Sequence, residues 1–419
     1  MGSDLLSYGQ AAAVAAAQAE ILGQSRVRVE SVPLGEAAGR VLAEPLCADR
    51  DQPPFARSTR DGFACRAAEA ETHSWLPIGG TTRAGQAPGG PLPGGSAWEI
   101  MTGAPVPAGA DAVAMLEHVE SAGGQIRLNP TRGLASGENI VAQGAEAREG
   151  ERLLPAGVRM GAAQIALAAA CGYAAIPAYA KPRVAILATG DELVPVDTQP
   201  APGQIRNSNG PMLAALAAKA GAEPWVLPVA LDRAEALDAA LAETAAADLL
   251  LISGGVSAGK FDLVEEALTR AGARFHFTGV RMQPGKPVVF GERPRSGGGP
   301  AEPRIQPFFG LPGNPISAAV TFLLFAAPVL AAMAGCPEAR PRFALALLAG
   351  SWQGKPGLTR FLPACCDFSW REGQFAQVTT LRSQGSGDLA AFARSNCFIV
   401  VPETVDRLEA GAVVSILLV

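Results

Sequence analysis

The second half of the chain alternates between short apolar runs and longer segments with a helical pattern. The apolar runs are rich in leucine and β-branched residues, as buried strands are: KPRVAILATG, EPWVLPVAL and LLLISGG. Helical segments follow these runs in turn: NSNGPMLAALAAKAG, DRAEALDAALAETAAA and FDLVEEALTRAG. Because strands joined by such helices form parallel sheets, the pattern predicts a doubly wound α/β domain over residues 181–336.

Shorter strands are predicted on both sides of this domain. Residues 47–146 are rich in glycine and proline, with short runs such as AWEIMTG and AVAMLEHVE, and predict a small β-rich domain. Residues 337–419 predict a C-terminal β domain from the runs ALALLAG, QFAQVTTL, CFIVVPE and AVVSILLV. The first 46 residues predict a helix, LLSYGQAAAVAAAQAEIL, and then a connecting segment.

One segment is apolar enough to suggest a membrane span. Residues 315–335 contain no charged side chain, and a stretch of about 20 apolar residues can cross a bilayer. The segment is mostly alanine, however, contains Pro328, and lacks flanking basic clusters and a belt of Trp and Tyr. We therefore expect a buried helix.

Composition narrows the class of protein. A chain of 419 residues is too long for one ordinary core, so several domains are expected. The net charge of −5 argues against a nucleic-acid binder, because phosphate backbones select basic surfaces; we expect a small-molecule partner and no membrane. The seven cysteines form no C-x-x-C pair and the N-terminus lacks the basic region of a signal peptide, so a cytoplasmic location is expected.

The stretch LLLISGGVSAGKFD, at 249–262, nearly matches a phosphate-binding P-loop. Gly254, Gly259 and Lys260 have the required spacing, but Phe261 stands where a P-loop needs a hydroxyl for magnesium. The same stretch can hold an anion in another way, through backbone N–H groups just before a helix. The residues that would form this cradle are Ser253, Gly254, Gly255 and Ser257, with Lys260 and Lys286 adding positive charge.

Acidic residues follow the predicted strands: Asp191, Glu192, Asp232 and Asp262. The carboxyl ends of parallel strands meet at one edge of a sheet, and carboxylates there suit Mg²⁺ together with substrate oxygens. Asp232 and Asp262 can also simply favour a helix N-terminus. Together with the glycine-rich cradle, the acids favour a metal-assisted phosphoryl reaction on a phosphorylated ligand.

Two further loops are candidates for binding. One fixes a turn and starts the long apolar helix, through Pro312, Gly313, Asn314 and Pro315, although a plain turn explains these residues almost as well. The other is QGSG at 384–387, which contains Ser386 and fits either an anion-holding nest or a loop without function.

Eight motifs occur in an order and spacing that resemble the molybdopterin molybdenumtransferase family, which includes the bacterial MoeA proteins and the E domain of gephyrin. They are STRDGFA (58–64), IMTGAPVPAGADAV (100–113), GENI (137–140), TGDEL (189–193), SGGVSAGKFD (253–262), PGKP (284–287), GLPGNPISA (310–318) and QGSGDLAAFARSN (384–396). The resemblance covers about residues 5–405.

The resemblance implies molybdenum insertion into adenylated molybdopterin, with release of AMP. It implies an α/β plus β multidomain fold, with a discontinuous N-terminal domain at 1–46 and 147–180, and a homodimer. Asp61 and Thr102 of one subunit would face the strand-end acids of the partner subunit, with Mg²⁺ held by Asp61, Glu192 and Asp262. The SGGVS stretch would hold the pterin phosphate, and Lys286 and Ser386 would contact molybdate.

Some positions depart from the family pattern. Gln283 stands where relatives commonly have lysine, and Leu358 where they have arginine. Three explanations are open: Lys355, Arg360 or Lys260 supplies the missing charge, the oxyanion is held weakly, or the chain is a paralogue with another substrate. A molybdopterin adenylyltransferase-like enzyme and a non-catalytic scaffold are the other readings, whereas the first strand of the α/β domain lacks the G-x-G-x-x-G of a dinucleotide enzyme.

Overall fold

The computed structural model describes residues 5–25, 28–87, 89–255, 263–295, 305–336, 340–369, 373 and 375–419. Contacts divide the chain into two compact units. Unit 1 comprises Met1–Ser31, Gly39–Ala43 and Pro177–Val419, and unit 2 comprises Val32–Ala38 and Glu44–Ile176. Each unit is described by itself.

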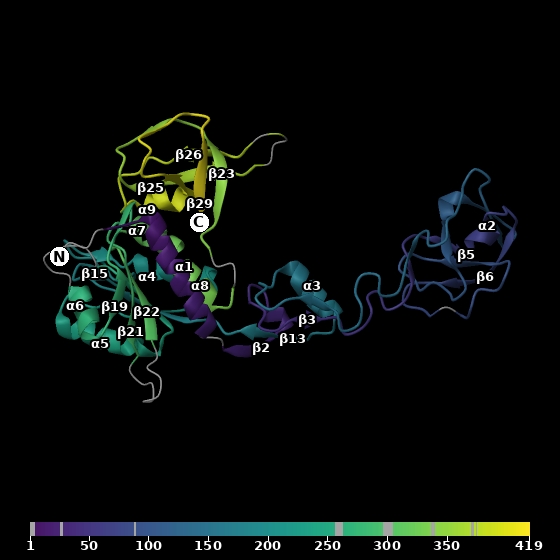
Figure 1. Cartoon of the computed structure of the whole chain (residues 1–419), viewed down its shortest axis with the longest axis horizontal. Coiled ribbons are helices and arrows are strands. Elements are labelled where there is room, and N and C mark those ends of the chain that lie inside the picture. Colours follow the sequence, from purple (N-terminus) through teal and green to yellow (C-terminus); the bar gives the residue numbers. More distant parts are fainter. Residues whose placement is uncertain are drawn as a thin grey trace. The chain divides into compact units, whose positions relative to one another are not determined.

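A six-stranded sheet forms the centre of the α/β domain in unit 1 (Figure 1). Its first four strands are parallel, as the alternating pattern predicts, whereas the fifth is antiparallel to the fourth and the sixth is antiparallel to the fifth. In spatial order the strands are β17 (Glu223–Val226), β14 (Arg183–Ala188), β18 (Leu249–Ser253), β22 (Ile305–Leu311), β21 (Val289–Pro294) and β19 (Arg274–Phe277).

Helices cover both faces of this sheet. Alternate residues of β14 point to opposite faces, so Val184 and Ile186 lie in one core while Ala185 and Leu187 lie in another. The first core contains α1 (Tyr8–Ser25), α4 (Asn209–Lys219), α7 (Pro315–Thr321) and α8 (Ala327–Met333). The second contains α5 (Ala234–Glu243) and α6 (Leu263–Arg270). The predicted doubly wound fold is confirmed.

The apolar segment forms one helical stretch from Pro315 to Met333, with a π-helical segment, Phe322–Ala326, between α7 and α8. Among the described residues it is the one helix long and apolar enough to cross a membrane, and 78% of its most apolar window is buried inside the protein. The π segment precedes Pro328, which has no N–H to donate to the preceding turn. The expected buried core helix is what the structure contains.

Helix α1 packs against α8, so it belongs to unit 1 (Figure 1). Its buried residues recur every fourth position, at Ala11, Ala15 and Ala19, which gives a smooth face for close packing. A Cβ on Gly23 would lie 3.1 Å from the carbonyl oxygen of Ala332, which shows how close the two helices are. The family resemblance places residues 1–46 and 147–180 in one discontinuous N-terminal domain. That domain and the boundaries of the other three domains stay a prediction.

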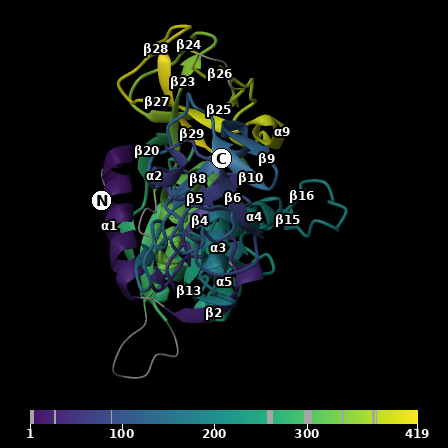
Figure 2. The same cartoon turned by 90° about the vertical axis from the view of Figure 1, so that its right-hand side faces the viewer.

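The C-terminal part of unit 1 is a closed β-barrel (Figures 1 and 2). Strands β25, β26, β23, β29 and β27 pair in that order, and β27 pairs again with β25, so the ring has no free edge. Strand β20 (Val280–Gln283) adds in parallel to β25 and places Gln283 opposite Arg360. The bounds are β1 (Leu6–Ser7), β23 (Phe343–Leu348), β24 (Trp352–Gln353), β25 (Thr359–Asp367), β26 (Gln377–Thr380), α9 (Leu389–Arg394), β27 (Cys397–Val401), β28 (Arg407–Leu408) and β29 (Val413–Leu418).

Unit 2 is built on a second six-stranded sheet, which confirms the predicted β-rich character of this region. Its strand order is β8 (Ala112–Met115), β5 (Gly62–Cys65), β7 (Ala97–Ile100), β6 (Leu76–Thr82), β10 (Gln125–Leu128) and β9 (Val119–Ala122). Its other elements are β3 (Leu46–Cys47), β4 (Arg57–Ser58), α2 (Ala67–Ala70), β11 (Ile140–Val141), β12 (Arg152–Leu154) and α3 (Ala162–Ala170). The remaining strands of the chain are β2 (Val29–Pro33), β13 (Ala175–Tyr179), β15 (Leu193–Val194) and β16 (Ile205–Arg206).

Candidate functional site

Three parallel strands of the α/β domain end at the same edge of the sheet. Strand β14 ends at Ala188, β18 at Ser253 and β22 at Leu311. The backbone N–H of Thr189 donates to Ser253 O at 3.0 Å, and that of Gly254 donates to Leu311 O at 3.2 Å. The loops that follow these strands are therefore adjacent, as the position of the motifs predicts.

Acidic side chains gather at this edge. The backbone N–H of Asp232 donates to Asp191 Oδ1 at 3.1 Å. Burial raises the pKa of Asp232, and the negative charges of Asp191 and Glu192 raise it further. Gly190 has a φ of 147°, a conformation that glycine adopts readily, and a Cβ there would lie 2.5 Å from Glu192 Oε2, so the carboxylate of Glu192 lies directly over this glycine. Asp262, the fourth predicted acid, lies outside the described residues.

The glycine turn after β18 allows close backbone packing. Gly254 and Gly255 have φ values of 98° and 63°. A Cβ on Gly254 would lie 2.5 Å from Thr189 O, and one on Gly255 would lie 2.4 Å from Val264 Cγ2. Both positions therefore require glycine. Ser253 is buried beside them, whereas Ser257 and Lys260 lie outside the described residues.

The loop after β22 contacts a loop of the C-terminal barrel. Pro315 begins α7, as predicted, and Pro312 and Gly313 precede it. Asn314 Nδ2 donates to Ser386 Oγ at 2.9 Å, and the N–H of Ile316 donates to Ser386 O at 3.0 Å. The two predicted loops, LPGNP and QGSG, are therefore in direct contact.

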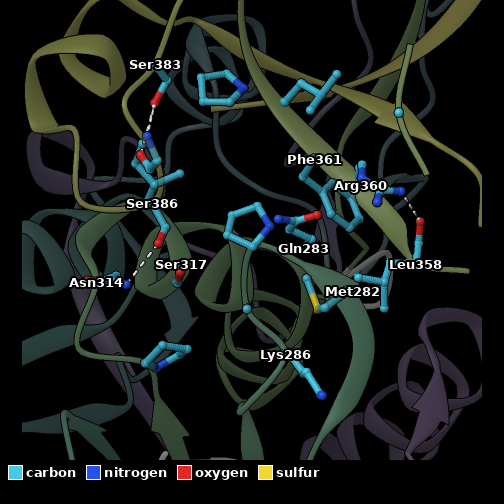
Figure 3. A pocket seen from close by; sticks show the side chains of 18 of the residues that line it. Met282, Gln283, Lys286, Asn314, Ser317, Leu358, Arg360, Phe361, Ser383 and Ser386 are labelled. Carbon is cyan, nitrogen blue, oxygen red and sulfur yellow. Dashed lines mark hydrogen bonds between the residues drawn. The ribbon is translucent and has the colours of Figure 1, made fainter. Parts of the chain in front are cut away.

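A cavity of about 630 Å³ lies beside this junction (Figure 3). The described residues that line it include three basic side chains, Lys286, Lys355 and Arg360, and no acidic one. Ser386 and Asn314 also line it, on the side opposite Arg360 (Figure 3). A cavity of this size with this charge suits a small anionic ligand.

The two departures from the family pattern, Gln283 and Leu358, both line this cavity. In Figure 3, Asn314 and Ser386 lie on one side, Leu358 and Arg360 on the other, and Gln283 between them. Arg360 Nη1 donates to Leu358 O at 3.4 Å, and the guanidinium carbon lies 5.8 Å from the centroid of a Trp352 ring. Arg360 therefore supplies a positive charge next to the position of Leu358.

Asp61 and Thr102 lie together in unit 2. Asp61 Oδ1 accepts hydrogen bonds from the N–H of Thr102 at 2.6 Å and from Thr102 Oγ1 at 2.9 Å. The backbone hydrogen bond and then the hydroxyl lower the pKa of this exposed carboxyl. That Asp61 meets the strand-end acids stays a prediction.

The described residues contain no group of three His, Cys, Asp or Glu side chains placed to hold a metal ion. Asp191 and Glu192 nevertheless repel the carboxylate of Asp232, and a bound divalent cation would reduce this repulsion. A Mg²⁺ site at this edge would therefore need a further ligand, from Asp262, the substrate or a second subunit.

Three residues of this region were not singled out from the sequence. Thr189 and Asn209 are buried among the strand-end loops, and Trp352 lines the cavity from β24. Asn209 is the first residue of helix α4, and asparagine is common at the start of a helix, so the sequence gives no sign of a further role. Trp352 lies 69 positions after Gln283 in a β-like run, so no local pattern connects the two.

Three family models match consecutive parts of the chain. The MoeA N-terminal region (domain I and II) matches residues 7–172, a probable molybdopterin binding domain matches residues 185–332, and the MoeA C-terminal region (domain IV) matches residues 346–419. The order of the three matches is the order of the predicted motifs.

Whole-chain relatives agree with these matches. The chain is 34% identical to a molybdopterin molybdenumtransferase of Bacillus subtilis, over 94% of this chain and 91% of that protein. It is 37% identical to one of a Nostoc species, over 74% and 71%. A solved molybdopterin biosynthesis MoeA protein of Pyrococcus horikoshii is 30% identical with a TM-score of 0.76, covering 99% of both chains, and a second such structure is 28% identical with a TM-score of 0.81, covering 99% and 100%. The chain belongs to the MoeA family of molybdopterin molybdenumtransferases.

Proposed function

We propose that this protein inserts molybdenum from molybdate into adenylated molybdopterin and releases AMP, which completes molybdenum cofactor synthesis. The observation that carries the proposal is the placement of two opposite electrostatic sites in one unit. Acidic side chains gather in the loops after β14 and β17, and the LPGNP loop, which follows β22 at the same edge of the sheet, borders a cavity whose described lining residues are basic but not acidic. A substrate with both a phosphoanhydride and an oxyanion partner needs this combination.

The basic cavity would receive molybdate and the dithiolene end of the substrate. A dianion requires several charge-assisted donors. Lys286 and Ser386 supply two of the predicted contacts, and Lys355 and Arg360 line the same cavity. Of the three explanations for Gln283 and Leu358, this favours the replacement of the missing charges by nearby basic residues.

The acidic edge would act on the phosphoanhydride. Glu192, Asp262 and the partner subunit's Asp61 would hold Mg²⁺, which when bound neutralises charge on the phosphates. Asp232 would accept the proton of the attacking water, since its raised pKa makes it a better base than an ordinary aspartate. The water oxygen would bond to the phosphorus of the adenylate, the anhydride P–O bond would break with the phosphate of molybdopterin as leaving group, and AMP would be released.

The site would be completed in a homodimer. Asp61 is exposed and its carboxyl is held ionised by Thr102, so it can meet a cation from outside its own unit. The reaction would take place in the cytoplasm, which fits the seven free cysteines.

The test is an assay of the whole reaction. Purified protein given adenylated molybdopterin, Mg²⁺ and molybdate should release AMP and yield a cofactor that reconstitutes an apo-molybdoenzyme. AMP release without active cofactor would instead support a paralogue with another substrate. Formation of the adenylate from molybdopterin and ATP would identify an adenylyltransferase, and no reaction of either kind would leave a scaffold role.

A further inference from the structure

The QGSG loop, which carries Ser386 at the cavity wall, has little rigidity of its own. Ser386 lies between Gly385 and Gly387, which have no side chain to restrict the backbone. Gly385 has a φ of 123°, and a Cβ built there would meet no atom within 4 Å, so side-chain packing does not hold the turn at that residue. Hydrogen bonds must therefore define where Ser386 lies.

Asp388, two residues after Ser386, makes several of these hydrogen bonds. Its Oδ2 accepts from the backbone N–H of Gln384 at 3.0 Å, and its Oδ1 accepts from that of Ala391 at 2.9 Å. The backbone N–H of Asp388 also donates to Gly385 O at 3.2 Å. The side chain thus connects the start of the loop with the first turn of α9, and Ser386 lies on the segment between these two points.

The charge of Asp388 is directed at the backbone of the loop. The hydrogen bond from Ala391, and then the one from Gln384, lower the pKa of Asp388, so the carboxyl is ionised at neutral pH. A carboxylate that faced an anion would repel it. Asp388, however, is not among the described residues that line the cavity, whereas Ser386 is. Its carboxylate can therefore hold the loop without pointing a negative charge into the cavity.

The LPGNP loop holds Ser386 from the other side (Figure 3). The Ser386 carbonyl accepts from the N–H of Ile316, and its hydroxyl accepts from Asn314 Nδ2. A hydroxyl that accepts one hydrogen bond still has its own hydrogen to donate, and an anion in the cavity is the acceptor that needs it. These contacts fix Ser386 itself, whereas those of Asp388 fix the chain on both sides of it.

We propose that Asp388 is a positioning residue for the oxyanion site, which holds the QGSG loop in the conformation from which Ser386 donates a hydrogen bond to molybdate. The inference rests on the proposed function, which makes molybdate the ligand of the cavity. Asp388 acts only through Ser386. Its loss should therefore weaken the binding of the oxyanion without changing the reaction of the bound substrate.

Asp388→Ser separates the loop contact from the helix cap. Serine is about as good an N-cap as aspartate, so the bond from Ala391 can persist, but one hydroxyl oxygen cannot connect two N–H groups as two carboxylate oxygens do. The Kd for molybdate, measured by isothermal titration calorimetry on the full chain, and the KM in cofactor formation should both rise about threefold to tenfold, the range for one ordinary hydrogen bond. The kcat at saturating molybdate should stay within about twofold of the wild-type value.

Two further variants test whether the effect passes through Ser386. Ser386→Ala should raise the Kd and the KM by itself, and Asp388→Ser should then add no further increase in the double variant. Asp388→Asn keeps the size of the side chain but turns an NH₂ group toward one of the two N–H donors. It should raise the Kd and the KM as Asp388→Ser does.

Asp51→Ser is the matched control. Asp51 belongs to unit 2 and also uses both carboxylate oxygens to hold a loop, since it accepts from the backbone N–H of Glu149 at 3.1 Å and from Gln143 Nε2 at 3.0 Å. It does not line the cavity. The variant loses the same kind of contact and should leave the Kd and the KM for molybdate unchanged.

The inference fails if Asp388→Ser binds molybdate as the wild type does, if it raises the KM as much in the Ser386→Ala background as alone, or if kcat falls while KM stays constant. If Asp388→Ser does not fold, Asp388→Asn provides the same three comparisons. When any of these results accompanies normal AMP release and molybdate binding by the wild type, the proposed function stands and only the role of Asp388 is lost. A wild type that neither releases AMP nor binds molybdate would remove the proposed function itself.

Discussion

Replacing Arg360 by glutamine should raise the KM for molybdate. Arg360 is half-buried in β25, and its contacts with Trp352 and Leu358 O hold the guanidinium at the cavity wall. A guanidinium has five N–H donors, and only one is used in the bond to Leu358. Most of its donors therefore remain for an anion.

The magnitude follows from burial and charge. A hydrogen bond to a charged group contributes about 1.5–3 kcal/mol, whereas an exposed ion pair contributes about 0–1 kcal/mol. Arg360 is neither fully buried nor exposed, so the value should be about 2 kcal/mol, which corresponds to about 30-fold in affinity. Lys286 and Lys355 remain in the variant and keep binding from being lost completely.

The assay measures cofactor formation against molybdate concentration at saturating adenylated molybdopterin. Arg407→Gln is the control, because it removes the same charge from an exposed residue of the same domain that pairs with Glu409 and does not line the cavity. Arg407→Gln should leave the KM unchanged. An Arg360→Gln enzyme with a wild-type KM would refute the assignment of the cavity to the oxyanion.

Three other outcomes are expected. Gly254→Ala places a Cβ 2.5 Å from a carbonyl oxygen at a residue whose φ is 98°. It should lower the unfolding free energy, measured by urea titration, by more than about 1 kcal/mol. Gly9→Ala is the control and should not lower it, because a Cβ there would meet no atom within 4 Å. Asp61→Asn should reduce AMP release by about a hundredfold; because it also loses the charged acceptor of two Thr102 hydrogen bonds, its unfolding midpoint should fall slightly, and equal activity would remove Asp61 from the site. Burial, and then the charges of Asp191 and Glu192, raise the folded-state pKa of Asp232, so its ionisation opposes folding. Asp232→Asn should therefore be more stable than wild type near neutral pH, and this gain should vanish as the pH falls below the ordinary value of 3.8. A gain that stays constant with pH would contradict the raised pKa.

The main layers of the α/β domain could be predicted because they depend on local pattern. The runs of leucine and β-branched residues predicted β14 and β18, and the helical periodicity between them predicted α4 and α5. The last two strands of the sheet, β19 (RFHF) and β21 (VFGERP), have shorter apolar runs and carry charged residues, so they lack the continuous apolar run of β14 and β18. Direction in a sheet depends on how the connecting segment returns, which a run of apolar residues does not encode.

The same division holds for the candidate site. Glycines, prolines and acids at strand ends were recognisable because a tight turn or a metal demands those residue types, and the sheet then brought their loops together. The hydrogen bonds of the Asn209 amide were not recognisable, since its two partners stand 44 and 104 positions away in the chain. Arg360 beside Trp352, and both beside Gln283, likewise required the barrel to close.

The sequence by itself determined the helices and strands that carry a strong periodic pattern, the residues that can bind anions or cations, and the family to which the order of the motifs corresponds. Tertiary structure alone decided that α1 packs on α8, that five C-terminal strands close into a ring, and that a basic cavity lies where the LPGNP and QGSG loops meet. The physical reason is that backbone preference and amphipathic period act over a few neighbouring residues. Cavities and hydrogen-bond partners, in contrast, arise from packing between segments far apart in the chain, where the fit of whole surfaces decides which groups meet.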